Sequence, residues 1–240
     1  SQGLLVVARR PPIDRYVLLA GLDVTVQIGE EVIPLTTHRL VGDRLEPDAR
    51  RRLAGFETSP WPQWTWDLGK GRVLRAEATA RQGTNQMVYN WQVESSPDPL
   101  TLRIQPLLAG RPMNSPRKKL ESLKLTPVQP NPRLYVWKLR PGCPPLALLT
   151  DGTFEPDPHW KEGFLHENRS TEDLACPGTF VWELKSRQRA WMIASTADDL
   201  EGDPNTAHEV AHLGRTLQTA ERTRRRLFRS ELDRAANSYI

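Results

Sequence analysis

Apolar residues recur at every second position in short segments through the first 202 residues, and this period of two constrains the fold more than any other feature. In one clear segment, Met87, Tyr89, Trp91 and Val93 fall on alternate positions. Successive side chains of a β-strand point to opposite faces of its sheet, so each such segment predicts a strand with one buried face. Because short turn sequences join the segments, we expect a meander of antiparallel strands.

The residues between these segments favour the same fold. Gly29 and Glu30 separate two alternating runs, and a glycine in the first position suits the two-residue turn of a type II′ hairpin. The chain also holds 21 prolines in 240 residues, well above the usual share of roughly 5%. Proline lacks a backbone N–H, so it is confined to strand edges and shortens helices. We therefore expect a mainly β protein with many loops, including a long exposed loop over residues 110–132.

The pattern changes after Asp203. Thr206 and Glu209 have the spacing of a capping box, which marks the start of a helix. Apolar residues then recur every three or four positions: Val210, Leu213, Leu217, Ala220, Leu227 or Phe228, Leu232, Ala235 and Tyr239. This spacing predicts an amphipathic helix that reaches the end of the chain. We expect a β domain over residues 1–202 and a helical segment over residues 203–240, cut from a longer protein.

Charge and cysteine content exclude several classes of protein. Lys and Arg total 33 against 29 Asp and Glu, so the net charge is only +4. A cluster of arginines near the C-terminus could bind phosphates, but a solvated helix face is the commoner reading, and we expect no nucleic acid partner. The cluster comprises Arg222, Arg224, Arg225, Arg226 and Arg229. Cys143 and Cys176 form no CxxC pair, which fits a reducing, cytoplasmic location. No apolar run approaches the roughly 18 residues of a membrane span.

Sequence motifs of catalysis and of metal binding are missing from the chain. His208 and His212 have the i, i+4 spacing of helical metal ligands, but no third ligand lies nearby, so we expect neither a metal nor a cofactor. Two adjacent carboxylate pairs occur, Glu172 with Asp173 and Asp198 with Asp199. Neighbouring residues of an extended segment point apart, whereas glycoside hydrolysis needs two carboxylates that flank one sugar. We expect no hydrolase site in this chain.

Residues 159–178 combine charge, aromatic rings and the turn-forming pair Pro177-Gly178. The stretch has neither the apolar face of a helix nor the alternation of a hairpin, so we predict a polar connection between strands, where binding residues tend to lie. The chain also contains eight tryptophans. Their rings can fill a large β core or stack on the apolar faces of sugars, and the sequence leaves both possibilities open for each of them.

Several stretches resemble the N-terminal domain of prokaryote-type glycogen debranching enzymes, the amylo-α-1,6-glucosidase family. They are residues 3–8, 15–23, 83–85 with Tyr89, 102–107 and 232–239, together with the spaced set Trp160, Phe164, Glu167, Arg169, Glu172, Asp173, Leu174, Pro177, Gly178 and Phe180. The order is kept over nearly the whole chain. The chain departs from the family pattern at residues 36–38 and at residues 110–114.

The resemblance implies a large antiparallel β-sandwich, a supersandwich like that of galactose mutarotases, followed by a C-terminal α-helix. It implies that residues 203–240 lead into an (α/α)6 barrel, absent from this chain, that carries the catalytic carboxylates. The parent would cleave α-1,6-glucosidic branch links of α-glucans such as glycogen or branched maltodextrin. This domain would support the barrel, help to bind the glucan and be inactive alone.

Candidate contact residues follow from the same stretch. Glu167 and Arg169 are two apart, so in an extended segment they share a face, and we expect Trp160 beside them on a rim that faces the barrel. Further candidates for glucan or domain contacts are Glu172, Asn85 and Arg111. Two alternatives remain: a free-standing carbohydrate-binding protein, and a mutarotase-like epimerase that uses His159 or His166 with Glu167. The apolar helix stripe also predicts self-association of the chain.

Overall fold

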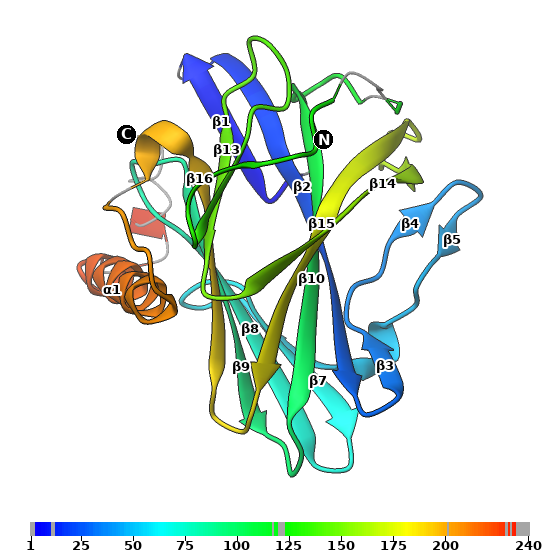
Figure 1. Ribbon diagram of the computed structural model, residues 1–240, viewed down its shortest axis with the longest axis vertical. Helices are drawn as coiled ribbons and strands as arrows, with labels where there is room; N and C mark the ends of the chain where they lie inside the picture. Colours follow the sequence, from blue (N-terminus) through cyan, green and yellow to red (C-terminus); the bar gives the residue numbers. More distant parts are fainter. Residues whose placement is uncertain are drawn as a thin grey trace.

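The computed structural model describes residues 3–10, 13–116, 118–119, 123–200, 202–228, 230 and 232–233. Two antiparallel sheets of eight strands each face one another, and helix α1 lies against the outside of one of them (Figure 1). The protein is therefore a large antiparallel β-sandwich, as predicted. No helix in the described part of the chain is both long and apolar enough to span a membrane.

Sheet A has the strand order β1-β2-β10-β15-β14-β4-β5, with β3 paired to β2. Its strands are β1 (Leu5–Arg10), β2 (Ile13–Ile28), β3 (Glu31–Pro34), β4 (Arg39–Leu40), β5 (Arg44–Leu45), β10 (Leu100–Pro112), β14 (Thr153–Leu165) and β15 (Thr171–Leu184). Gly29, with a φ of 59°, makes the predicted two-residue turn between β2 and β3. A left-handed φ is one that glycine adopts without strain.

Sheet B has the order β11-β12-β13-β16-β9-β8-β7-β6. Its strands are β6 (Leu53–Glu57), β7 (Gln63–Gly69), β8 (Arg72–Ala80), β9 (Gln86–Ser95), β11 (Val128–Asn131), β12 (Leu134–Trp137), β13 (Leu146–Thr150) and β16 (Arg189–Thr196). The short helices η1 (Arg50–Arg52) and η2 (Ala197–Asp199) lie in its connections, and α1 spans Ala207–Arg226. The alternating residues Tyr89, Trp91 and Val93 of β9 face the core between the sheets, as predicted.

Most of the tryptophans serve the core. Six of the eight are buried: Trp61, Trp66, Trp91, Trp137, Trp182 and Trp191. Aromatic rings follow one another through the core in the order Tyr89, Trp91, Trp182, Phe180, Phe154, Tyr135 and Trp137, with neighbouring centroids 4.9 to 6.3 Å apart. Only Trp64 and Trp160 are partly exposed. The structure thus decides between core and surface for each tryptophan, which the sequence left open.

Helix α1 begins with the predicted capping box. The Thr206 hydroxyl accepts a hydrogen bond from the Glu209 amide at 3.2 Å, and the Glu209 carboxylate accepts one from the Thr206 amide at 3.0 Å. The helix packs on β16, β13 and β9 of sheet B. At Gly214 it lies so close to the sheet that a Cβ atom would come within 2.3 Å of the buried Trp191 ring, so this contact requires glycine.

The prediction of one helix to the end of the chain was wrong. Helix α1 ends at Arg226, and Leu227 and Leu232 are 77% and 79% exposed. The residues that α1 buries are Val210, Gly214, Leu217, Gln218 and Glu221, so the sheet supports the helix no further than Glu221. A helix without tertiary packing is marginal in water. Arg229, Ala235 and Tyr239 lie outside the described residues, and self-association stays a prediction.

The prediction of a polar connection over residues 159–178 was also wrong. Most of the stretch belongs to β14 and β15, which pair along their length and leave only residues 166–170 as a turn. Pro177 and Gly178 lie inside β15 rather than in a turn. The strand tolerates Pro177 because the pairing with β10 and with β14 is interrupted beside it, where a proline costs no ladder hydrogen bond. Similarly, β10 continues to Pro112, into the region predicted as an exposed loop.

Candidate functional site

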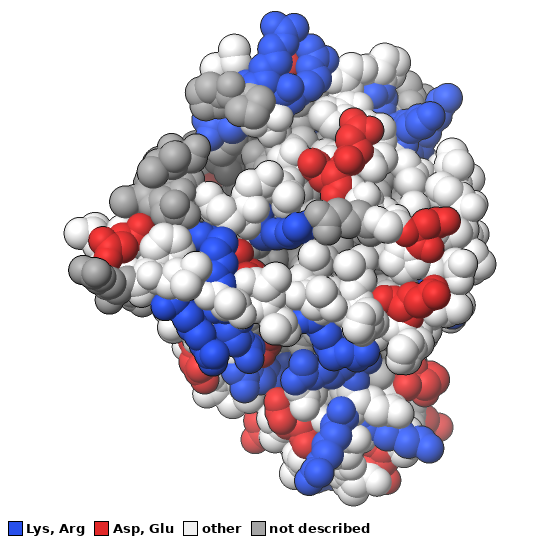
Figure 2. Space-filling view, turned by 90° about the vertical axis from the view of Figure 1, so that its left-hand side faces the viewer, with Lys and Arg blue, Asp and Glu red and all other residues white. Residues whose placement is uncertain are grey.

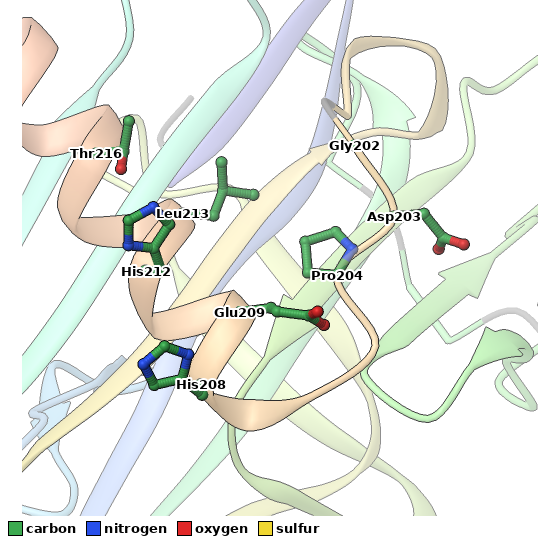
Figure 3. A pocket seen from close by; sticks show the side chains of 8 residues that line it. All are labelled: Gly202, Asp203, Pro204, His208, Glu209, His212, Leu213 and Thr216. Atoms are coloured by element: carbon green, nitrogen blue, oxygen red, sulfur yellow. The ribbon is translucent and has the colours of Figure 1, made fainter.

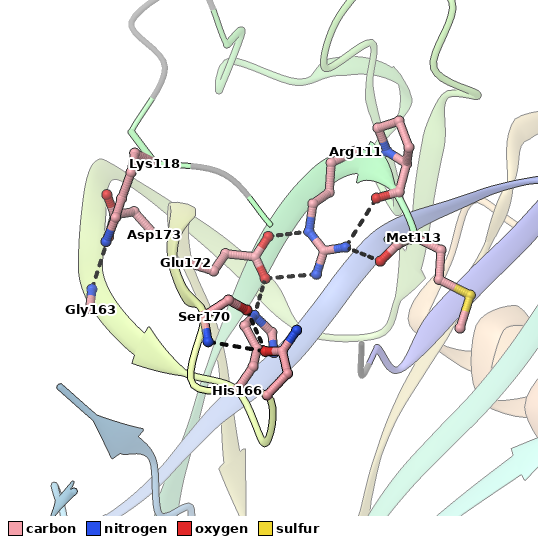
Figure 4. Close-up of polar contacts among 10 residues, drawn as sticks. Arg111, Met113, Lys118, Gly163, His166, Ser170, Glu172 and Asp173 are labelled. Carbon is pink, nitrogen blue, oxygen red and sulfur yellow. Dashed lines mark hydrogen bonds and ion pairs between the residues drawn. The ribbon is translucent and has the colours of Figure 1, made fainter. Parts of the chain in front are cut away.

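Arg111 of β10 and Glu172 of β15 form a buried ion pair beside the turn at residues 166–170 (Figure 4). The antiparallel register that pairs Leu108 with Ala175 brings these two side chains opposite one another. Both oxygens of Glu172 accept from the guanidinium, from Nε and from Nη2, the latter at 2.8 Å. Nη1 donates to the carbonyls of Pro112 and Met113 at 3.1 and 2.7 Å. Arg111 is fully buried and Glu172 is 2% exposed, so the pair is satisfied without solvent.

The same carboxylate holds the turn. His166 Nε2 lies 3.0 Å from Glu172 Oε2. Within the turn, the His166 amide donates to the Ser170 carbonyl and the Arg169 amide donates to the His166 carbonyl, both at 2.9 Å. Asn168 Oδ1 accepts from the amide and the hydroxyl of Ser170 at 3.0 and 2.6 Å. The turn is therefore fixed both internally and to a buried charge.

Asp173 points to different partners from its neighbour Glu172. Its Oδ1 accepts from the Gly163 amide and its Oδ2 from the Lys119 amide, both at 2.9 Å. Lys118 Nζ lies 3.7 Å from Oδ1. Successive residues of a strand project to opposite sides, and each of these carboxylates is engaged by protein groups.

A second buried carboxylate, Asp23 of β2, lies in the same sheet. Lys161 of β14 contacts Asp23 Oδ2 and donates to Gln105 at 2.7 Å, and the Thr36 hydroxyl donates to Asp23 Oδ1 at 2.7 Å. Burial by itself raises the pKa of Asp23, but hydrogen bonds from His38, Lys161 and Thr36 outweigh it and hold the pKa well below its ordinary value. Asp23 thus stays ionised. An aspartate directly after the mainly apolar strand of residues 15–22 was the sequence signal for this group, and sequence reasoning missed it.

The structure separates the predicted rim residues. Trp160 is partly buried on the core and borders a hollow of only about 10 Å³. Glu167 and Arg169 are exposed in the turn. Arg169 has a left-handed φ of 63°, so the assumption of an extended segment, in which Glu167 and Arg169 share a face, was wrong. Asn85 lies elsewhere, where its amide donates to Asp199 Oδ2 at 2.7 Å and ties the β8–β9 loop to η2.

The histidines and arginines of α1 have other surroundings. His208 and His212 are exposed and line a shallow depression with Asp203 and Glu209 (Figure 3). Among the described residues, no group of three His, Cys, Asp or Glu side chains is placed to hold a metal. Burial raises the pKa of the free thiols Cys143 and Cys176 to about 11, which keeps both protonated and unreactive at neutral pH.

The arginine cluster is partly engaged within the chain. Arg222 and Arg225 lie over the Trp61 ring, 5.1 and 5.6 Å from its centroid, and Glu221 accepts from Arg224 and Arg225. Figure 2 shows Lys and Arg side chains across this face of the molecule, with Asp and Glu among and beside them. The cation–π contacts, with a hydrogen bond from Arg225 to the Pro60 carbonyl, hold the end of α1 against the connection between β6 and β7, whereas the Glu221 ion pairs lie within the helix.

Fold and site together define an antiparallel β-sandwich domain that presents a turn anchored by a buried ion pair. Residues 1–191 match the family described as "Glycogen debranching enzyme N terminal", and the chain belongs to that family. The resemblance seen in the sequence is thereby confirmed. No match to the chain was found among curated proteins.

Proposed function

We propose that this chain is the non-catalytic N-terminal domain of a cytoplasmic glycogen debranching enzyme. Its partner is the catalytic domain of the same polypeptide, which hydrolyses α-1,6-glucosidic links, and the sandwich supports that domain and helps to bind the α-glucan. The family match over residues 1–191 supports the parent activity. In this proposal catalysis belongs to the other domain, because Glu172 and Asp173 are committed to Arg111 and to backbone amides.

One observation carries the proposed contact with the catalytic domain. The turn at residues 166–170 is held by a buried ion pair, yet its charged members Glu167 and Arg169 are exposed at its tip. A pre-organised surface loses less conformational entropy on binding than a mobile one. Arginine is enriched among the residues that contribute most to interfaces, since its planar fork can bind a carboxylate with two hydrogen bonds.

The test is Arg169→Ala in the full-length enzyme. We expect debranching activity to fall about tenfold, while the free energy of unfolding changes by less than about 0.5 kcal/mol, as for other exposed substitutions. Arg187→Ala is a matched control, because Arg187 is also exposed in a turn and has a similar φ of 67°. Activity should be measured on branched dextrin and stability by denaturant unfolding.

Equal activity of the two variants would contradict the proposal. So would an Arg169→Ala enzyme that melts earlier but keeps normal activity in its folded fraction, since that outcome assigns Arg169 to stability alone.

A further inference from the structure

A cavity of about 440 Å³ lies between the two sheets, where β2 and the segment after β3 face strands β7, β8 and β9. Its volume falls in the range of roughly 300–1,000 Å³ that is typical of small-molecule sites. The wall formed by sheet B is aromatic and includes Trp64, Trp66, Tyr89 and Trp91. Thr37 and His38 line the opposite side, and Arg50 lies at the border.

Trp64 packs against the core, but unlike the other aromatic residues of this wall it is not fully buried. It is one of the two partly exposed tryptophans, and it pairs across the sheet with Phe56 of the edge strand β6. The two ring centroids are 5.4 Å apart, and Phe56 is 52% exposed. The exposed Phe56 and the partly exposed Trp64 thus form an aromatic pair at the edge of the sheet, beside a cavity with an aromatic wall.

Arg50, which lines the cavity, is hydrogen-bonded to Asp48, which lies next to it but is not among the lining residues. Arg50 donates to both oxygens of Asp48, from Nε at 2.8 Å and from Nη2 at 2.7 Å, and both side chains are exposed. The guanidinium has five donors and the carboxylate about four acceptor positions, so this pair keeps capacity for further hydrogen bonds. Arg52 Nη2 lies 3.6 Å from Oε1 of Glu31 in β3, and this ion pair holds η1 near the tip of the β2–β3 hairpin.

We propose that this cavity is the glucan-binding site of the domain. A glucopyranose ring has an apolar C–H face and a rim of hydroxyls. The face would stack on Trp64 beside Phe56, and the hydroxyls would bond to Arg50 and Asp48. The ligand class rests on the function proposed above. The location differs from the contact expected at Trp160. Trp160 borders a hollow of only about 10 Å³, which has space for roughly one water molecule and none for a sugar ring.

The experiment titrates the 240-residue chain with maltoheptaose and follows tryptophan fluorescence and heat of binding. We expect saturable binding that is absent with cellohexaose, whose β-linked rings follow a different path. Trp64→Ala should weaken binding at least about tenfold, and Phe56→Ala should weaken it less. Trp160→Ala is the matched control, because it removes the other partly exposed tryptophan, and it should retain affinity within about twofold.

Circular dichroism and the melting temperature establish that each variant is folded. Phe56→Ala keeps the test decisive if Trp64→Ala does not fold, because half of the Phe56 side chain is already in solvent. Failure of the unmodified chain to bind maltoheptaose at millimolar concentrations would overturn the site. So would equal losses in Trp64→Ala and Trp160→Ala, or binding of an apolar dye without any binding of sugar. None of these outcomes bears on the Arg169 measurement, so the contact with the catalytic domain is judged separately.

Discussion

Two carboxylates near opposite ends of the β14–β15 hairpin have pKa values shifted in opposite directions: Asp23 is near the turn end, and the partly buried Asp151 is at the open end. At the turn end, Glu172 is paired with Arg111, and nearby Asp23 is paired with Lys161. At the open end, two residues before β14, the Asp151 carboxylate accepts from two neutral donors, the Trp182 indole at 2.6 Å and the Trp191 amide at 2.8 Å, while Arg133 donates to the Asp151 backbone carbonyl at 3.1 Å. Burial raises the pKa of Asp151 to about 6, because these hydrogen bonds offset only part of the lost hydration.

The contrast between Asp23 and Asp151 shows that the hydrogen-bonding partner, rather than the depth of burial, decides whether such a carboxylate stays charged. Near the turn end, Asp23 stays ionised at neutral pH because its pKa is lowered. The open end holds a group that changes protonation near neutral pH.

The largest effect should come from breaking the pair at the turn end. Glu172→Gln leaves the fully buried Arg111 guanidinium without its counter-charge, and we expect a loss of about 3 kcal/mol in the free energy of unfolding. Glu155→Gln is the control, because Glu155 of β14 pairs with Arg103 at 2.7 Å on the exposed surface of the same sheet. An exposed pair contributes roughly 0–1 kcal/mol. Urea unfolding of both variants measures the difference.

A double variant sharpens that result. Replacing both partners by apolar residues, Arg111→Met with Glu172→Leu, removes the uncompensated charge and should recover more than half of the loss. Equal small losses of unfolding free energy in Glu172→Gln and Glu155→Gln would mean that the buried Arg111–Glu172 pair contributes no more to stability than an exposed ion pair.

The next effect concerns pH at the open end. The folded pKa of Asp151 is about 6, above its ordinary value of 3.8, so the folded state binds this proton more tightly than the unfolded state. The stabilisation from the protonated group is present at low pH and is lost as pH rises through 6. The difference corresponds to at most about 3 kcal/mol at pH 8.

Asp151→Asn keeps the acceptor oxygen and removes the ionisation. We therefore expect it to raise the free energy of unfolding by about 2 kcal/mol at pH 8 and to change it little at pH 4. Asp23→Asn should behave in the opposite way and lose stability at pH 8, because the folded pKa of Asp23 is lowered. Destabilisation of Asp151→Asn at both pH values would show that hydrogen-bond geometry, not charge, governs this end.

Local patterns were enough to predict much of the fold. The alternation in β9, the turn at Gly29 and the capping box at Thr206 all involve residues close in sequence, and all are confirmed. The prediction of a turn at Pro177 was wrong because proline usually ends a strand. Here the hydrogen-bond ladders that join β15 to β10 and to β14 are both interrupted beside Pro177, so the strand continues through it. That compensation comes from other strands and leaves no trace near Pro177 in the sequence.

The candidate site was less predictable for the same reason. Arg111 and Glu172 were each selected from the sequence, but their pairing joins residues 61 positions apart and depends on which strands are neighbours in sheet A. Exposure of the tryptophans is likewise a tertiary property. Trp64 and Trp66 both follow the alternation of β7 and both pair with residues of the edge strand β6, yet Trp66 is buried and Trp64 is partly exposed.

The smallest effect on stability tests the tips of the two turns that flank β15. Arg169 and Arg187 both have left-handed φ angles, 63° and 67°, which cost a residue with a side chain roughly 1 kcal/mol relative to glycine. Glycine also gains entropy in the unfolded chain, so Arg169→Gly and Arg187→Gly should each stabilise the protein by only about 0.5 kcal/mol. If Arg169 contacts the catalytic domain, Arg169→Gly should be the more stable enzyme and yet lose as much debranching activity as Arg169→Ala, whereas Arg187→Gly should keep full activity. Paired melting curves and dextrin assays measure both quantities, and full activity in Arg169→Gly would show that the strained arginine serves no contact at the turn end.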